Sequence, residues 1–197
     1  ISGTCCSQIF SSKGFQPAYE LTARQTFDKL WKASDDGSLP VVIDVSSCAY
    51  TLHHIRPVLS AENQLKFDRL RILDSVDFLH SMVLPRLGAV RKKDRIVLHP
   101  VCSLEKMKSG PAFLAIAHYF AEEVQVPMNS GCCGMAGDRG FLIPELPASA
   151  TKSEAAEVGA QPAGGYYSST RTCEMAMTEA TNKNYESILY LADEATG

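Results

Sequence analysis

Seven cysteines are the residues through which this sequence could do chemistry, and four of them form two adjacent pairs. They stand at Cys5, Cys6, Cys48, Cys102, Cys132, Cys133 and Cys173. An odd number of cysteines cannot pair completely in disulfides within one chain, and neighbouring cysteines are poor partners for each other. The pattern is therefore more typical of metal ligation or redox chemistry than of a disulfide framework.

The cysteines follow one pattern that occurs twice. Each adjacent pair is followed by a polar turn that ends in Gly-Phe. A lone cysteine in a Ser/Thr-rich segment comes next, with 41 or 39 residues between it and the pair. This repetition predicts two homologous halves, residues 1–90 and 91–197. The second half has a further cysteine, Cys102, before its pair. The first half has no counterpart, so we expect the sequence to begin inside a repeat.

The second half alone supplies four thiolates, from Cys102, Cys132, Cys133 and Cys173. Four thiolates can bind a [4Fe–4S] cluster or a structural zinc ion. The adjacent pair favours the cluster, because neighbouring side chains can bind different irons without strain. By the repetition, Cys5, Cys6 and Cys48 correspond to Cys132, Cys133 and Cys173. When each cysteine is taken alone, the alternative is a small apolar core residue.

Three other residues stand close to these cysteines in the sequence. Gly131 and Gly134 flank the adjacent pair and allow a tight turn, or a close approach of backbone N–H groups to a cluster. His99 follows a predicted strand, where a histidine is more often a hydrogen-bonded structural residue than a metal ligand. We expect all three around the metal ligands, and no Ser/His/Asp array indicates a catalytic site.

The elements that must position these residues alternate between strand and helix, which predicts an α/β fold with a parallel sheet. Every cysteine cluster then lies just after a strand, at the carboxyl edge where open α/β sheets bind ligands. Helices are expected over 16–33, 49–58, 111–123, from 75 to about 87 and from Cys173 to about 180. Strands are expected over 40–45, 71–74, 95–99, 124–128, 165–168 and 187–191.

Composition excludes several classes of protein. The chain has 197 residues, 45% of them hydrophobic and 21% charged, as is usual for a globular domain. A formal net charge of -3 without a basic run gives no sign of nucleic-acid binding. The sequence contains neither a long apolar stretch nor a signal peptide at residues 1–10. A cytoplasmic location is therefore expected.

The segment Ser130-Gly131-Cys132-Cys133-Gly134, with Cys102 before it and Cys173 after it, resembles the cysteine-rich "CCG" domain. That domain occurs in the cysteine-rich subunit of heterodisulfide reductase, and in iron–sulfur subunits of glycolate oxidase and of anaerobic glycerol-3-phosphate dehydrogenase. The whole chain is most similar to the C-terminal iron–sulfur part of bacterial FAD-linked D-lactate dehydrogenases.

The resemblance implies an electron-transfer module of an oxidoreductase. In such enzymes an N-terminal flavin domain, which holds the FAD, oxidises a 2-hydroxy acid, and electrons pass through iron–sulfur centres toward a quinone or cytochrome. The parent enzyme could associate peripherally with the inner face of the membrane. The present chain is expected to be inactive alone. The resemblance implies a [4Fe–4S] cluster at Cys102, Cys132, Cys133 and Cys173 of the intact protein, whereas the chain given could hold zinc or no metal there. It also implies that Cys5, Cys6 and Cys48 would be three ligands of a second site.

The sequence departs from the family pattern at three positions. Thr51 and Ala176 stand where the motif often has a last cysteine, and Ser7 replaces the glycine after the first pair. The double cluster of heterodisulfide reductase is therefore not expected. A zinc-binding or metal-free scaffold domain is the main alternative, and thiol–disulfide chemistry at the adjacent pairs is a weaker one.

Overall fold

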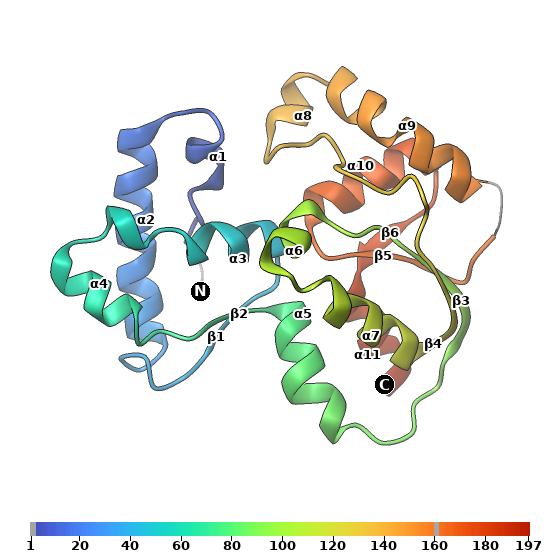
Figure 1. Cartoon of the computed structure of the whole chain (residues 1–197), viewed down its shortest axis with the longest axis horizontal. Coiled ribbons are helices and arrows are strands. Elements are labelled where there is room, and N and C mark those ends of the chain that lie inside the picture. The colour runs from blue at the N-terminus through green and yellow to red at the C-terminus, as the bar shows by residue number, and fades with distance from the viewer. Residues whose placement is uncertain (1–2, 160–161) are drawn as a thin grey trace. The chain divides into compact units, whose positions relative to one another are not determined.

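The computed structural model describes residues 3–159 and 162–197, and the chain divides into two compact units, Ile1–Asp74 and Ser75–Gly197. Both units contain parallel strands connected by helices, so the predicted α/β class is confirmed (Figure 1). No helix of the described residues combines the length and the apolar character that a membrane span requires.

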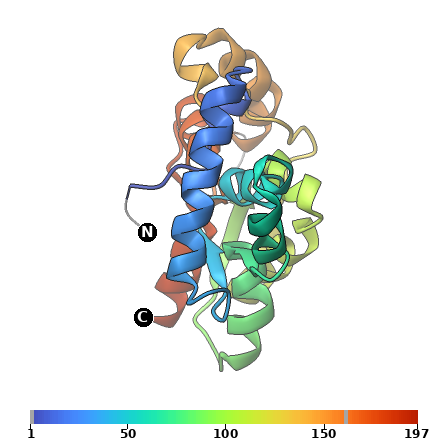
Figure 2. The ribbon, with the colours of Figure 1, turned by 90° about the vertical axis from the view of Figure 1, so that its left-hand side faces the viewer.

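The first unit contains a two-stranded parallel sheet surrounded by helices. Strands β1 and β2 pair over three residues each, and α1 packs against the long helix α2 (Figure 2). The core lies between α2, α3 and the strands. The elements are α1 (Gln8–Ser11), α2 (Gln16–Ala33), β1 (Val41–Ile43), α3 (Ser46–His53), η1 (Arg56–Val58), α4 (Ala61–Phe67) and β2 (Ile72–Asp74).

The second unit is built around a four-stranded parallel sheet in the order β4-β3-β5-β6. Its elements are α5 (Ser75–Phe78), η2 (Leu79–Val83), η3 (Leu84–Arg86), β3 (Lys93–Leu98), α6 (Cys102–Met107), α7 (Gly110–Phe120), β4 (Ala121–Gln125), α8 (Arg139–Leu142), α9 (Glu145–Gly159), β5 (Tyr166–Ser168), α10 (Arg171–Thr181), β6 (Tyr185–Ser187) and α11 (Ile188–Thr196).

The central strand β3 shows why this sheet is covered on both faces. Successive side chains of a strand point to opposite faces. Ile96 and Leu98 accordingly join the larger core with α7 and α11, whereas Val97 joins a smaller core with Val158 of α9 and Met177 of α10. Such burial on both faces explains the continuous apolar run of this strand, which is typical of parallel sheets.

The two compact units and the two sequence halves have different boundaries. The compact units meet between Asp74 and Ser75, whereas the sequence repetition places the division after residue 90. The reason is that α5 and η2 pack against α7, with Val76 and Leu79 buried in the core of the second unit. The helix that follows β2 in sequence thus belongs to the second unit.

The expected strand over residues 187–191 is wrong. The strand is Tyr185–Ser187, and α11 begins at Ile188. The Ser187 hydroxyl accepts a hydrogen bond from the N–H of Leu189, at 3.3 Å, and so caps the helix. Ile188, Leu191 and Ala192 are buried and are spaced three and four residues apart, as on one face of a helix. In the sequence alone, a short apolar run such as this one is equally compatible with a strand.

Candidate metal centre

The candidate site lies at the carboxyl end of the sheet in the second unit. His99 directly follows β3, Cys133 lies in the segment after β4, and Cys173 comes five residues after the last residue of β5. The chain runs outward from β3 to β4 and then returns to β5 on the other side of β3. Ligands of open α/β sheets bind at such a change of winding direction, beyond the carboxyl ends of the strands.

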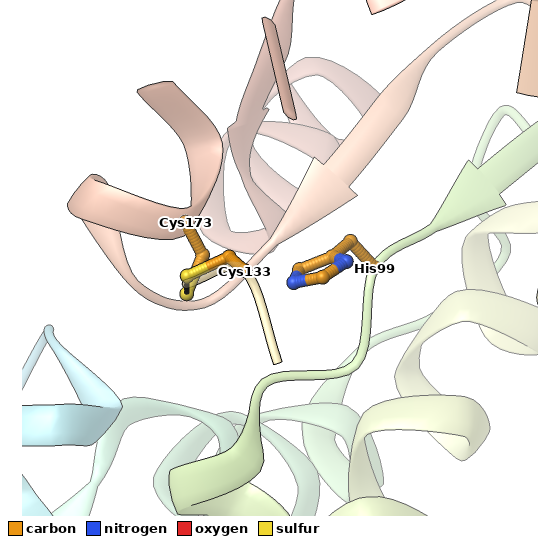
Figure 3. A group of neighbouring side chains, drawn as sticks. All are labelled: His99, Cys133 and Cys173. Carbon is orange, nitrogen blue, oxygen red and sulfur yellow. Dashed lines mark hydrogen bonds between the residues drawn. The ribbon is translucent and has the colours of Figure 1, made fainter. Parts of the chain in front are cut away.

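His99, Cys133 and Cys173 form a buried group that could hold a metal ion. One potential ligand atom from each lies within 4.8 Å of the other two, and a ring nitrogen of His99 faces the two thiols (Figure 3). The two sulfur atoms are 2.7 Å apart and are not joined in a disulfide. Imidazole nitrogen and thiolate sulfur are the donors that zinc and iron prefer in proteins.

Glu154 of α9 fixes the orientation of His99. Its Oε1 lies 2.8 Å from Nδ1 of His99, and both side chains are almost completely buried. The other ring nitrogen, Nε2, is buried without a hydrogen-bond partner. A carboxylate that holds one nitrogen of an imidazole while the other is left for a metal is the usual arrangement around metal-binding histidines. The donor set and the position of this nitrogen therefore fit a metal ion.

The hydrogen bond between the two buried thiols shifts their pKa values in opposite directions. A hydrogen bond from the Cys173 thiol lowers the pKa of Cys133 to about 5, against the opposing effect of burial, and nearby His99 lowers it further. The same hydrogen bond and burial raise the pKa of Cys173 above its usual range. Burial lowers the pKa of His99, but its interactions with Cys133 and Glu154 outweigh burial and raise the pKa to about 9.

Cys102 and Cys132 lie beside this group but are exposed. Burial of part of its surface, and then the neighbouring Cys132, raise the pKa of Cys102. Both thiols also interact electrostatically with Cys173. The structure thus brings the four cysteines expected from the sequence into one neighbourhood, with two buried and two at the surface.

Of the two glycines that flank the pair, only Gly134 stands where a side chain would clash with the backbone. Its φ is +76°, and a Cβ there would lie 2.7 Å from the backbone oxygen of Leu146 and 2.8 Å from Cα of Pro147. The pair is thereby held close to the start of α9. A Cβ at Gly131 would meet no atom within 4 Å, so that position tolerates a side chain.

Helix α9 contributes two carboxylates that the sequence patterns did not indicate. Besides Glu154, Glu157 accepts hydrogen bonds from the backbone N–H groups of Met128 and Asn129, at 2.8 and 3.1 Å, and so holds the segment that leads to Cys132. The buried face of α9 contains Thr151, Glu154 and Val158. Two of these three residues are polar, so the hydrophobicity of the sequence does not show the helical period of α9.

The cysteines of the first unit repeat part of this arrangement. Cys48 and Cys173 are each the third residue of a helix and follow the last strand residue by five positions. A hydrogen bond from Cys48 lowers the pKa of Cys6 to about 7, while the pKa of Cys48 is raised. Cys5 is exposed, and its sulfur accepts a hydrogen bond from the N–H of Ser7 at 3.4 Å.

Ser7 and Gly134 have the same backbone conformation although their side chains differ. Each directly follows an adjacent cysteine pair, and their φ angles are 72° and 76°. A left-handed conformation costs a residue with a Cβ about 1–2 kcal/mol. Ser7 is also completely buried, and its Oγ has no hydrogen-bond partner. The turn after the pair therefore has the same backbone conformation in the first unit, although serine stands there in place of glycine.

No protein-family model matches the chain. The resemblance to CCG domains therefore rests on the cysteine and glycine pattern of the sequence itself.

Replacing Ser7 with glycine should stabilise the first unit. Ser7→Gly removes the left-handed strain and the buried hydroxyl, and we expect the free energy of unfolding to rise by about 1 kcal/mol. Urea unfolding followed by circular dichroism measures the change. Ser12→Gly is the control, because Ser12 has a right-handed φ of -64°; equal stabilisation by both changes would contradict the strain at Ser7.

Alanine substitutions at the two flanking glycines should differ sharply in effect. Gly134→Ala forces a Cβ against the backbone of α9 at a positive φ, and we expect a loss of roughly 2–4 kcal/mol in stability. Gly131→Ala has open space and should stay within about 0.5 kcal/mol of the original protein. Urea unfolding of both variants tests the difference, and similar midpoints would show that the turn can move away from α9.

The metal-free, reduced protein should retain one buried thiolate in mildly acidic solution. Because the pKa of Cys133 is lowered to about 5, its negative charge is present above that pH and is lost as the pH falls through it. The ultraviolet absorbance of the thiolate, recorded during an acid titration, reports this step. Cys133→Ser should abolish the step, and its survival in that variant would assign the charge to another thiol.

Proposed function

We propose that the second unit binds a [4Fe–4S] cluster through Cys102, Cys132, Cys133 and Cys173. The observation that carries the metal centre is the buried group of His99, Cys133 and Cys173, in which Nε2 of His99 has no hydrogen-bond partner. Four neighbouring cysteines supply the thiolate count that such a cluster requires. The cluster would supply one-electron transfer.

We further propose that this centre relays electrons within a flavin-dependent dehydrogenase of D-lactate or a related 2-hydroxy acid. Electrons would come from the FAD of an N-terminal domain and pass to a quinone or cytochrome. The resemblance of the sequence to that enzyme class supports this role. The exposure of Cys102 and Cys132 is compatible with it, because two of the proposed ligands then lie at the surface, where a redox partner can approach.

A single zinc ion is the second candidate for the same site. Three possible ligand atoms within 4.8 Å of one another are compact enough for one tetrahedral ion. The contact between Glu154 and His99 also matches the carboxylate–histidine–zinc arrangement. Cys102 or Cys132 would then supply the fourth ligand, and the domain would serve as a scaffold or interface in the enzyme.

Metal and sulfide analysis of the full chain, prepared without oxygen, tests the proposal. The cluster predicts iron and acid-labile sulfide in equal amounts and an electron paramagnetic resonance signal after reduction. Cys133→Ser should lose most of the iron. Zinc without sulfide would replace the relay by the scaffold role, and a chain without any metal after anaerobic reconstitution would overturn both.

A variant of Glu154 separates the contribution of His99 from that of the cysteines. Glu154→Gln removes the charge that orients the imidazole, and a zinc ion bound through His99 should then bind about 10–100-fold more weakly. Competition with a chromophoric chelator measures this affinity. Glu145→Gln, an exposed position on the same helix, is the control. Unchanged affinity in Glu154→Gln would exclude His99 as a ligand.

A further inference from the structure

The two-stranded sheet of the first unit corresponds to one half of the sheet in the second unit. Strand β1 pairs with β2 in a parallel register over three residues, as β5 does with β6. A helix begins directly after β2, at Ser75, and directly after β6, at Ile188. Because Cys48 and Cys173 also follow β1 and β5 at the same distance, β1 corresponds to β5 and β2 corresponds to β6.

Strand β5 has a neighbouring strand on each side, whereas β1 has one. In the second unit, β3 pairs with the edge of β5 that faces away from β6. The N–H of Val97 donates to the carbonyl oxygen of Gly165 at 3.0 Å. The N–H of His99 donates to that of Tyr167 at 2.9 Å. Among the described residues, β2 is the only strand paired with β1, so the corresponding edge of β1 is free.

Val42 is the residue of β1 whose backbone faces this free edge. The N–H of the neighbouring Val41 donates to the carbonyl oxygen of Arg71 at 2.8 Å, on the β2 side. In a parallel pair, alternate residues bond to the same neighbouring strand, so the N–H and C=O of Val42 point the other way. Val42 corresponds to Tyr167, whose carbonyl oxygen binds β3. The free edge therefore offers the backbone groups that a further strand needs.

The side chains of β1 are those of an internal strand. Its sequence Val-Val-Ile is wholly apolar and β-branched, which is typical of parallel strands covered on both faces. The outer strands of the second sheet, β4 and β6, instead contain glutamates, which are charged residues that protect sheet edges. Val42 is nevertheless 41% exposed, whereas its counterpart Tyr167 is 1% exposed. Strand β1 thus has the composition of an internal strand and the exposure of an outer one.

We propose that the free edge of β1 binds one more parallel strand, an extended β-branched segment like β3. We assign this strand to polypeptide that precedes residue 1 in a longer form of the protein. In the second unit β3 precedes the adjacent cysteine pair, so its counterpart would precede Cys5 and Cys6. Three residues offer few hydrogen bonds, and a covalent connection supplies the high effective concentration that such a short edge requires.

The residue before β1 is compatible with this pairing. Pro40 has no N–H, but its counterpart Gly165 contributes its carbonyl oxygen to β3, a group that proline retains. The proposed pairing needs neither a metal nor electron transfer, and it therefore goes beyond the proposed function. Metal analysis of the second unit and a measurement on β1 can give opposite results.

Hydrogen exchange resolved to single amides tests the proposal on the 197-residue chain and on the longer protein that includes the preceding polypeptide. The Val42 amide should exchange rapidly in the chain and about 100-fold more slowly in the longer protein, because its N–H is then bonded. The Val41 amide, which already bonds to Arg71, is the control and should be protected in both.

Three outcomes of this experiment would overturn the proposal. The first is equal exchange of the Val42 amide in the two proteins. The second is protection that increases with concentration in the 197-residue chain alone, which would assign the edge to a second copy. The third is a natural gene product that begins at residue 1, because no preceding strand would then exist.

A charge on β1 should matter only when the additional strand is present. Val42→Lys changes an exposed side chain in the 197-residue chain, so its midpoint of urea unfolding should change little there. In the longer protein the same change should lower the midpoint of the first unit, because the position is then covered, as Tyr167 is. Leu65→Lys, an exposed position on α4, is the control and should leave both midpoints unchanged. An equal effect of Val42→Lys on both proteins would contradict the additional strand.

Discussion

The contact between His99 and Glu154 is the constraint on which the geometry of the candidate site depends. A carboxylate and an imidazole that are both removed from water are stable only when they are paired. Their contact connects the end of β3 to α9, and the start of α9 in turn packs on Gly134 beside the cysteine pair. One buried polar pair thus aligns an imidazole nitrogen with sulfur atoms from two other segments.

Whereas Glu154 and His99 attract each other, two buried thiolates at Cys133 and Cys173 would repel each other. In the fold, the hydrogen bond between Cys133 and Cys173 favours one thiolate beside one protonated thiol, and His99 next to them also lowers the pKa of Cys133. A metal ion would take the place of that proton and neutralise both sulfur atoms. The same arrangement thus supports a stable metal-free state and a site for a cation.

The sequence predicts the parallel α/β class and the position of cysteines after strands, because β-branched runs and turn residues are local signals. It does not indicate Glu154 as a partner of His99, because a glutamate on a helix is normally exposed and the burial of this one depends on the distant β3. It also favours a structural role for His99, which lies in the structure among the possible ligands. Pairings between distant segments are thus what the local patterns miss.

The position of α5 determines where the chain can be shortened if the second unit is to be expressed alone. A shortened chain that begins at residue 91, where the sequence repetition suggests a boundary, would lack Val76 and Leu79, although both are buried against the apolar side chains of the second unit. Each omitted side chain would leave apolar surface open to water, at a cost of about 1.5–3 kcal/mol. A chain that begins at Ser75 keeps this helix and is the version suited to independent expression.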